Sequence, residues 1–201
     1  MSTSGTASYS FNAQRLADDV KPLVFGESQG IENRQWTTEG KFGPALTLDG
    51  AQYGEVPHSA SFNLTNITVE SWIKIDRFAD TAAAPILYKG DGATRQFALW
   101  ANADGSLSFN VYVNNAGQYS ATTAANLVGV DKWQHVAAVM DRDTGRLHIY
   151  IDGVERANSA GITSPGYYTP WITGNPMFIG RTLEAQGNFE GAIDDVRVWN
   201  V

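Results

Sequence analysis

Strict alternation of apolar and polar side chains over residues 106–114 is the feature that most constrains how this chain can fold. Leu107, Phe109, Val111 and Val113 form an apolar set, and every residue between them is Ser, Asn or Tyr. A period of two places the apolar set on one side of an extended strand, whereas a helix would spread it around its axis. The segment therefore predicts a strand with one buried face and one solvated face, with Tyr112 on the solvated one.

The same period recurs along the rest of the chain. Val69, Ser71, Ile73 and Ile75 predict one face of another strand, and further strand-like runs cover residues 45–48, 52–56, 86–89, 96–101, 133–140, 146–151, 177–179 and 194–199. Turn pairs separate them: Asp49-Gly50, Asp91-Gly92, Asp104-Gly105, Thr144-Gly145 and Asp152-Gly153. Because Asp-Gly supplies the positive φ of a tight turn, these pairs predict hairpins. Many short strands at roughly ten-residue spacing predict an all-β sandwich or barrel.

Length and composition limit the classes of protein that the chain can belong to. Its 201 residues fit one large β domain, which we expect to span residues 7–201 after a disordered or appended tail at residues 1–6. The absence of cysteine excludes disulfides and thiolate metal sites, and the net charge of -7 disfavours nucleic acid as a partner. No apolar stretch approaches the roughly 20 residues of a membrane span, and the first residues contain no signal segment.

Eight segments in a fixed order carry a resemblance to a known family. They are residues 45–50 (ALTLDG), 53–57 (YGEVP), 67–74 (ITVESWIK), 86–90 (ILYKG), 132–137 (KWQHVA), 147–153 (LHIYIDG), 178–180 (FIG) and 189–200 (FEGAIDDVRVWN). In this order they resemble the laminin-G-like (LamG) jelly-roll domains of the concanavalin A-like lectin/glucanase superfamily. The resemblance implies a two-sheet antiparallel β-sandwich, often glycan-binding and part of a larger secreted or cell-surface bacterial protein. One fold hosts many functions, so it does not specify a ligand.

The resemblance also implies a structural calcium ion that ties the N-terminal segment to the last strand. Asp194 matches the position of the ligand on the last strand, and Asn12 would contribute from the opening segment. Relatives often have an acidic residue where this chain has Asn12. The alternative is that Asp194 and Asp195 are ordinary turn or solvent-facing residues. Residues 141–145 (DRDTG) resemble part of a calcium loop, but a hairpin turn is the preferred interpretation because the bidentate glutamate is missing.

Aromatic residues among polar neighbours are the candidates for sugar binding, because a flat ring stacks on the apolar face of a pyranose. Trp100 alternates with Phe97 and Leu99, which places it on the same kind of polar face as Tyr112 and Asn110. Tyr119, Tyr167, Tyr168 and Trp171 are expected in loops around this platform. The alternative is that these rings only cover sheet edges. We assign Trp72, Trp133 and Trp199 to packing in the core or between the sheets, since they lie in the fold-carrying segments.

Catalytic residues are not apparent in the sequence. Glucanases of the superfamily are similar in having a Glu-x-Asp-x-x-Glu strand, and here no Glu is followed two residues later by Asp. Asp194 and Asp195 are neighbours on a predicted strand and should therefore point to opposite faces. The preferred hypothesis is a non-catalytic carbohydrate-binding module, lectin-like and calcium-stabilised. The alternatives are a protein–protein adhesion module without a sugar site, and a polysaccharide hydrolase or lyase with dispersed catalytic residues.

Overall fold

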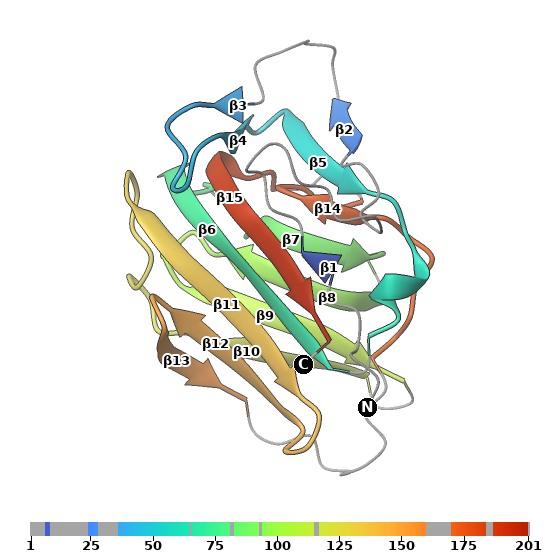
Figure 1. Cartoon of the computed structure of the whole chain (residues 1–201). Coiled ribbons are helices and arrows are strands. Elements are labelled where there is room, and N and C mark those ends of the chain that lie inside the picture. The colour runs from blue at the N-terminus through green and yellow to red at the C-terminus, as the bar shows by residue number, and fades with distance from the viewer. Residues whose placement is uncertain are drawn as a thin grey trace.

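The chain forms two antiparallel β-sheets packed face to face (Figure 1). The computed structural model describes residues 7–8, 24–27, 36–64, 66–80, 83–92, 94–114, 117–159, 170–183 and 187–200. The two packed sheets confirm the predicted all-β sandwich. The predicted tail at residues 1–6 lies outside the described residues. In the described part of the chain, no helix has the length and apolar character needed to cross a membrane.

In the part of the chain that the structure describes, one sheet has eight strands and the other has seven. The eight-stranded sheet has the order β13 (Val154–Asn158), β12 (Arg146–Ile151), β11 (Trp133–Asp141), β6 (Ile67–Arg77), β15 (Glu190–Trp199), β4 (Ala45–Asp49) and β3 (Trp36–Thr37), with β1 (Ala7–Ser8) also paired to β15. The seven-stranded sheet has the order β10 (Gly117–Thr122), β9 (Leu107–Val113), β8 (Arg95–Ala101), β7 (Ala84–Gly90), β14 (Met177–Ile179), β5 (Gln52–Val56) and β2 (Val24–Glu27). Neighbours in the sheets are often distant in the sequence, as in a jelly roll.

The alternating segments supply the core between the two sheets. Leu107, Phe109, Val111 and Val113 are buried in one continuous cluster, together with Val69, Ile73 and Ile75 from the facing sheet. The even-numbered residues of β9 are only partly buried and lie on the outer face. The period of two therefore predicted correctly which side chains face inward and which face solvent.

Four of the five predicted turn pairs join strands that are hydrogen-bonded to each other. They connect β7 to β8, β8 to β9, β11 to β12, and β12 to β13. Asp141 accepts backbone hydrogen bonds from Asp143 and Thr144, as expected for a turn at residues 141–145. The hairpin predicted at Asp49-Gly50 was wrong, because β4 and β5 belong to different sheets and Gly50, at φ 87°, turns the chain from one sheet to the other.

A fully buried lysine closes one end of the core. Lys89 lies on β7 with its Nζ 4.7 Å from the centre of the Phe62 ring, and it donates to the carbonyl of Asn175 at 2.6 Å. Burial lowers the pKa of Lys89 to about 8. The lysine links the loop after β5 to the loop before β14, and it lies in the interior rather than on either outer face.

Candidate functional site

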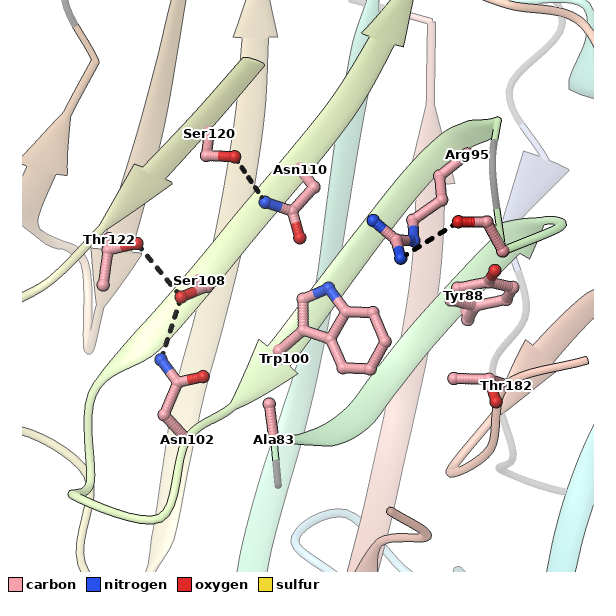
Figure 2. A pocket seen from close by; sticks show the side chains of 11 residues that line it. Ala83, Tyr88, Arg95, Trp100, Asn102, Ser108, Asn110, Ser120, Thr122 and Thr182 are labelled. Atoms are coloured by element: carbon pink, nitrogen blue, oxygen red, sulfur yellow. Dashed lines mark hydrogen bonds between the residues drawn. The ribbon is translucent and has the colours of Figure 1, made fainter. Parts of the chain in front are cut away.

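A hollow of about 570 Å³ lies on the outer face of the seven-stranded sheet. Figure 2 shows Trp100 in the middle of this pocket, with an aromatic and cationic side at β7 and the start of β8, and a polar side at β9 and β10. The lining residues are Ala83, Tyr88, Gly92, Arg95, Trp100, Asn102, Ser108, Asn110, Ser120, Thr122 and Thr182. The pocket thus lies on the face that alternation predicts to be solvated.

The aromatic side is a small apolar cluster separate from the main core. Phe97, Leu99 and Ala101 of β8 point inward, so Trp100 points outward. Its indole meets the ring of Tyr88 edge-on, with ring centres 5.8 Å apart. Trp100 and Tyr53 pack on a buried group made of Tyr88, Ala98 and Phe178. This support holds the indole in place while leaving it partly exposed in the pocket.

The polar side is a row of amide and hydroxyl groups. Strand pairing sets Asn110 opposite Ser120 and Ser108 opposite Thr122. The Asn110 amide donates to Ser120 Oγ at 2.6 Å, and the hydroxyls of Ser108 and Thr122 are hydrogen-bonded at 3.0 Å. Asn102 extends the row by donating to Ser108 Oγ at 2.8 Å. Figure 2 shows the carbonyl oxygen of Asn110 on the side of Trp100, where it can accept a hydrogen bond from a ligand.

Arg95 places a positive charge at the edge of the pocket. Its Nη1 donates to Gln118 Oε1 at 2.7 Å, and its Nη2 donates to the carbonyl of Gly92 at 3.3 Å. The guanidinium lies 5.6 Å from the centre of the Trp100 ring, within the range of a cation–π contact. Among the described residues no carboxylate forms an ion pair with it.

The structure brings two of the predicted ligand-binding residues, Trp100 and Asn110, into this pocket. Tyr112 is the next outward residue of β9, but its ring lies beyond the pocket and meets Trp171 edge-on, with ring centres 6.0 Å apart. Trp171 also donates its backbone N–H to the carbonyl of Tyr112 at 2.8 Å. These two rings form a separate rim on the same sheet. Tyr167 and Tyr168 lie outside the described residues.

Tyr119 was expected in a loop, but it lies on a strand. It lies on β10 opposite Val111 and packs against the main core, so its side chain shares the inner face of the sheet with Val111. The outward residues of β10 are instead Gln118, Ser120 and Thr122, and the last two line the pocket. The interpretation failed because β10 has few apolar residues and its strand character was not apparent from the sequence.

The outer face of the eight-stranded sheet carries a second group of aromatic and charged side chains. The expectation that Trp72, Trp133 and Trp199 pack in the core was wrong, because all three alternate with the core residues of their strands and face outward. Trp72 is 5.4 Å from the His135 ring between centres, and Lys41 Nζ is 4.4 Å from its indole. Trp199 donates its indole N–H to Glu70 at 2.9 Å.

Asp194 and Asp195 lie at a bulge on this second face. The register of β15 against β6 shifts between Asp194 and Arg197, and Asp195 takes φ 52°. Asp194 is paired with the outward-facing Trp72, whereas Asp195 forms an ion pair with the outward-facing Arg197. The prediction that the two carboxylates point to opposite faces was therefore wrong, because the bulge breaks the alternation.

Each of the two carboxylates has one oxygen with no hydrogen-bond partner among the described residues. Asp194 is fully buried and accepts a hydrogen bond from the backbone N–H of Phe42 through Oδ2 at 2.9 Å. The Oδ1 atoms of Asp194 and Asp195 are enclosed and accept no hydrogen bond from the described residues. Burial raises the pKa of Asp195, which Arg197 partly opposes. Enclosed carboxylate oxygens of this kind are costly without a cation or donor.

The donor chemistry at the bulge suits calcium, but the described residues do not complete a site. Oxygen ligands from carboxylates and carbonyls are what calcium prefers. β1 pairs with Val198 and Arg197, so the N-terminal segment does run beside the last strand. Asn12 lies outside the described residues. Within the described ranges, no three His, Asp or Glu side chains converge as a metal site.

Comparison with known proteins agrees with the architecture. The sequence of residues 48–201 matches a laminin-G-type family model described as the Concanavalin A-like lectin/glucanases superfamily. No curated protein matches the sequence. These strands, their order and the sequence match define a sandwich of the lectin and laminin-G class. The chain belongs to the Concanavalin A-like lectin/glucanases superfamily.

Solved structures share the fold at low sequence identity. Domain 4 of AbnA, an extracellular GH43 arabinanase from Geobacillus stearothermophilus solved with arabinotriose, has a TM-score of 0.69 at 19% identity, covering 96% of this chain and 91% of that one. The CBM40 of the Ruminococcus gnavus IT-sialidase, bound to α2,3 sialyllactose, has a TM-score of 0.64 at 16% identity, covering 78% and 90%. Mouse laminin α1 LG4-5 has a TM-score of 0.58 at 18% identity, covering 77% and 40%.

Proposed function

We propose that this chain is a non-catalytic carbohydrate-binding module that holds a glycan in the pocket around Trp100. The observation that carries the proposal is the meeting of a partly exposed indole with a row of hydroxyl and amide groups in one hollow. A sugar has the matching chemistry, since its CH face is apolar and its rim is made of hydroxyls. Sugar-bound relatives of the same fold, such as domain 4 of AbnA with arabinotriose, support a glycan as the ligand class.

The expected affinity is modest. One indole and a few hydrogen bonds contribute about 1 kcal/mol each, and binding must first offset the cost of immobilising the ligand. Dissociation constants in the micromolar to millimolar range follow from these terms. The open pocket and short polar side chains favour one or two sugar rings held at an exposed site rather than an enclosed ligand.

A glycan panel followed by calorimetry with two variants tests the proposal. Trp100→Ala should weaken binding of any glycan found by about ten-fold or more, because it removes the stacking surface. Trp133→Ala is the matched control, since Trp133 faces outward on the other sheet. Equal binding by both variants and the wild type would place the sugar elsewhere, and a panel with no ligand at millimolar concentration would overturn the proposal.

A structural calcium ion at the β15 bulge is part of the proposal. Asp194 and Asp195 would supply carboxylate oxygens, and Asn12 with its neighbours would complete the shell from the opening segment. The ion would act as a clamp between the N-terminal segment and the last strand. Its presence would also offset the cost of the two enclosed Oδ1 atoms.

Thermal unfolding with calcium and with EDTA tests the clamp. Calcium should raise the melting temperature of the wild type, because an ion that binds only the folded state stabilises it by mass action. Asp194→Ala should abolish that rise, whereas Asp143→Ala in the exposed turn before β12 should keep it. An unchanged melting temperature in the wild type would contradict the clamp.

We further propose that the module is part of a secreted or cell-surface protein and contributes binding rather than catalysis. One observation favours the alternative of a protein adhesion module. The exposed side chains of Trp171 and Ile172 lie beside Tyr112 and form an apolar patch, which is typical of protein contact surfaces. The enzymatic alternative is tested by measuring whether the protein releases reducing ends from a panel of polysaccharides. Sustained release that survives purification of the protein would overturn the non-catalytic assignment.

A further inference from the structure

We infer that the pocket around Trp100 selects a sugar that carries a carboxylate, which Arg95 binds. This inference rests on the proposed glycan-binding function and assigns the class of sugar. Arg95 lines the pocket directly, and its guanidinium borders the indole on which a ring would stack. A ligand that covers Trp100 therefore brings its substituents within reach of the guanidinium.

The guanidinium is held in place by neutral groups only. Gln118 and the Gly92 carbonyl accept one hydrogen bond each, and a guanidinium carries more N–H groups than these two bonds use. No ion pair neutralises Arg95 in the described part of the chain. Its positive charge and its remaining donors are therefore positioned for an anion, and a planar carboxylate matches their fork geometry.

A second arginine on the same outer face repeats the arrangement. Arg181 lies 4.2 Å from the centre of the Tyr53 ring, and it donates to the carbonyl of Thr182, a residue of the pocket lining. Tyr53 contacts Phe178 edge-on, and Phe178 pairs with Tyr88 beside Trp100. An aromatic row thus runs across β5, β14, β7 and β8 with an arginine over each end. Adjacent strands lie about 4.8 Å apart, so the two ends are roughly 15 Å apart.

This positive pair contrasts with the charge of the whole protein. The chain carries a net charge of -7, so its overall field disfavours anions, and an acidic sugar would be attracted only by the local charges of Arg95 and Arg181. Glu55 also faces outward on β5, but it forms no ion pair with Arg95 or Arg181 among the described residues. An acidic oligosaccharide whose first carboxylate meets Arg95 could extend along the row toward Arg181.

Matched acidic and neutral sugars test the inference by calorimetry. One pair is α-1,4-linked trigalacturonic acid and its carboxyl-reduced counterpart; the other is a xylo-oligosaccharide with and without one glucuronic acid. We expect the acidic member of at least one pair to bind ten-fold or more tightly than its neutral member. Raising the salt from 50 mM to 500 mM should weaken the acidic member and leave the neutral one unchanged.

Variants assign that preference to the arginine. Arg95→Gln should reduce the acidic-to-neutral ratio to near one, whereas Arg156→Gln, an exposed arginine on β13, should leave it unchanged. Arg181→Gln should weaken only the ligand with several carboxylates, by about two- to five-fold. A ten-fold preference that persists in Arg95→Gln would overturn the inference.

The outcomes also separate this inference from the proposed function. Equal binding of acidic and neutral members, or binding of neutral sugars alone, would overturn the carboxylate preference and leave a glycan-binding pocket. Absence of binding to every member and to the wider glycan panel would overturn both.

Discussion

The two outer faces of the sandwich both carry aromatic and arginine side chains, but the arginine is ion-paired on one face and has only neutral partners on the other. On the eight-stranded sheet, Arg197 forms ion pairs with Asp195 and Glu70, and Trp199 donates its indole N–H to Glu70. On the seven-stranded sheet, Arg95 lies beside Trp100 with only neutral acceptors. One face is internally neutralised and the other presents its charge at a hollow.

Whether an arginine is ion-paired within the protein distinguishes a structural role from a binding role. The residue type alone does not. Aromatic and arginine side chains occur on both faces, so their presence alone identifies neither. Where an arginine already forms ion pairs with carboxylates of the protein, its removal should destabilise the fold. Where an arginine has no carboxylate partner in the described residues, its removal should change only what the surface binds.

The largest expected effect is on stability at the neutralised face. Arg197→Ala should lower the free energy of unfolding by about 1–3 kcal/mol, because it leaves the buried carboxylate of Asp195 without its ion-pair partner and removes one of the contacts of Glu70. Arg95→Ala should change it by less than about 0.5 kcal/mol. Urea unfolding at pH 7 measures both. Equal losses from the two variants would remove the distinction between the faces.

The next effect is on binding at the open face. Asn110→Ala should weaken glycan binding by about five-fold, since it removes a polar group worth about 1 kcal/mol from the pocket. His148→Gln, on the outer face of β12, should leave affinity unchanged. Calorimetry with the best ligand of the panel compares the two, and a weaker ligand affinity in His148→Gln would place binding on the wrong sheet.

A smaller effect concerns the pH dependence of stability at the bulge. Burial raises the pKa of Asp195 in the folded state above its ordinary value of about 4. Its contribution to stability is therefore full below that ordinary value and is lost as pH rises through the raised pKa. With calcium removed by EDTA, the difference in unfolding free energy between the wild type and Asp195→Asn should shift against the wild type across this range. A difference independent of pH would contradict the raised pKa.

The smallest effect is expected at the rim. Tyr112 faces outward near the pocket, but its ring contacts Trp171 rather than the pocket lining. Tyr112→Ala should therefore weaken glycan binding by less than about three-fold, well below the effect of Trp100→Ala. An effect as large as that of Trp100→Ala would extend the binding surface along β9 to the Trp171 rim.

Much of the fold was predictable because alternation is a local property. The apolar and polar faces of residues 106–114 and 69–75 were assigned correctly, since their side chains follow a regular pleat. The short strands β1, β2 and β3 and the polar strands β10 and β13 were missed, because they contain few apolar residues in alternation. Asp49-Gly50 was misassigned because the pair specifies a turn but not which sheet the next strand joins.

The site was only partly predictable, because it depends on which strands pair. Alternation placed Trp100 and Asn110 on the polar face, but Ser120 and Thr122 reach the pocket through pairing with β9. Arg95 was missed because a register shift between Lys89 and Gly90 interrupts the alternation at the start of β8. Irregular pairing at the bulge likewise reversed the expected side of Asp195.

A nuclear magnetic resonance titration with the best glycan of the panel tests the central claim most directly. We expect amide shifts to move in residues 95–102, 108–110 and 118–122, with the indole N–H of Trp100 among the most affected signals. Signals of Trp72, Trp133 and Trp199 should stay in place. Shifts concentrated on those three tryptophans, with the Trp100 signal unmoved, would contradict a glycan pocket on the seven-stranded sheet.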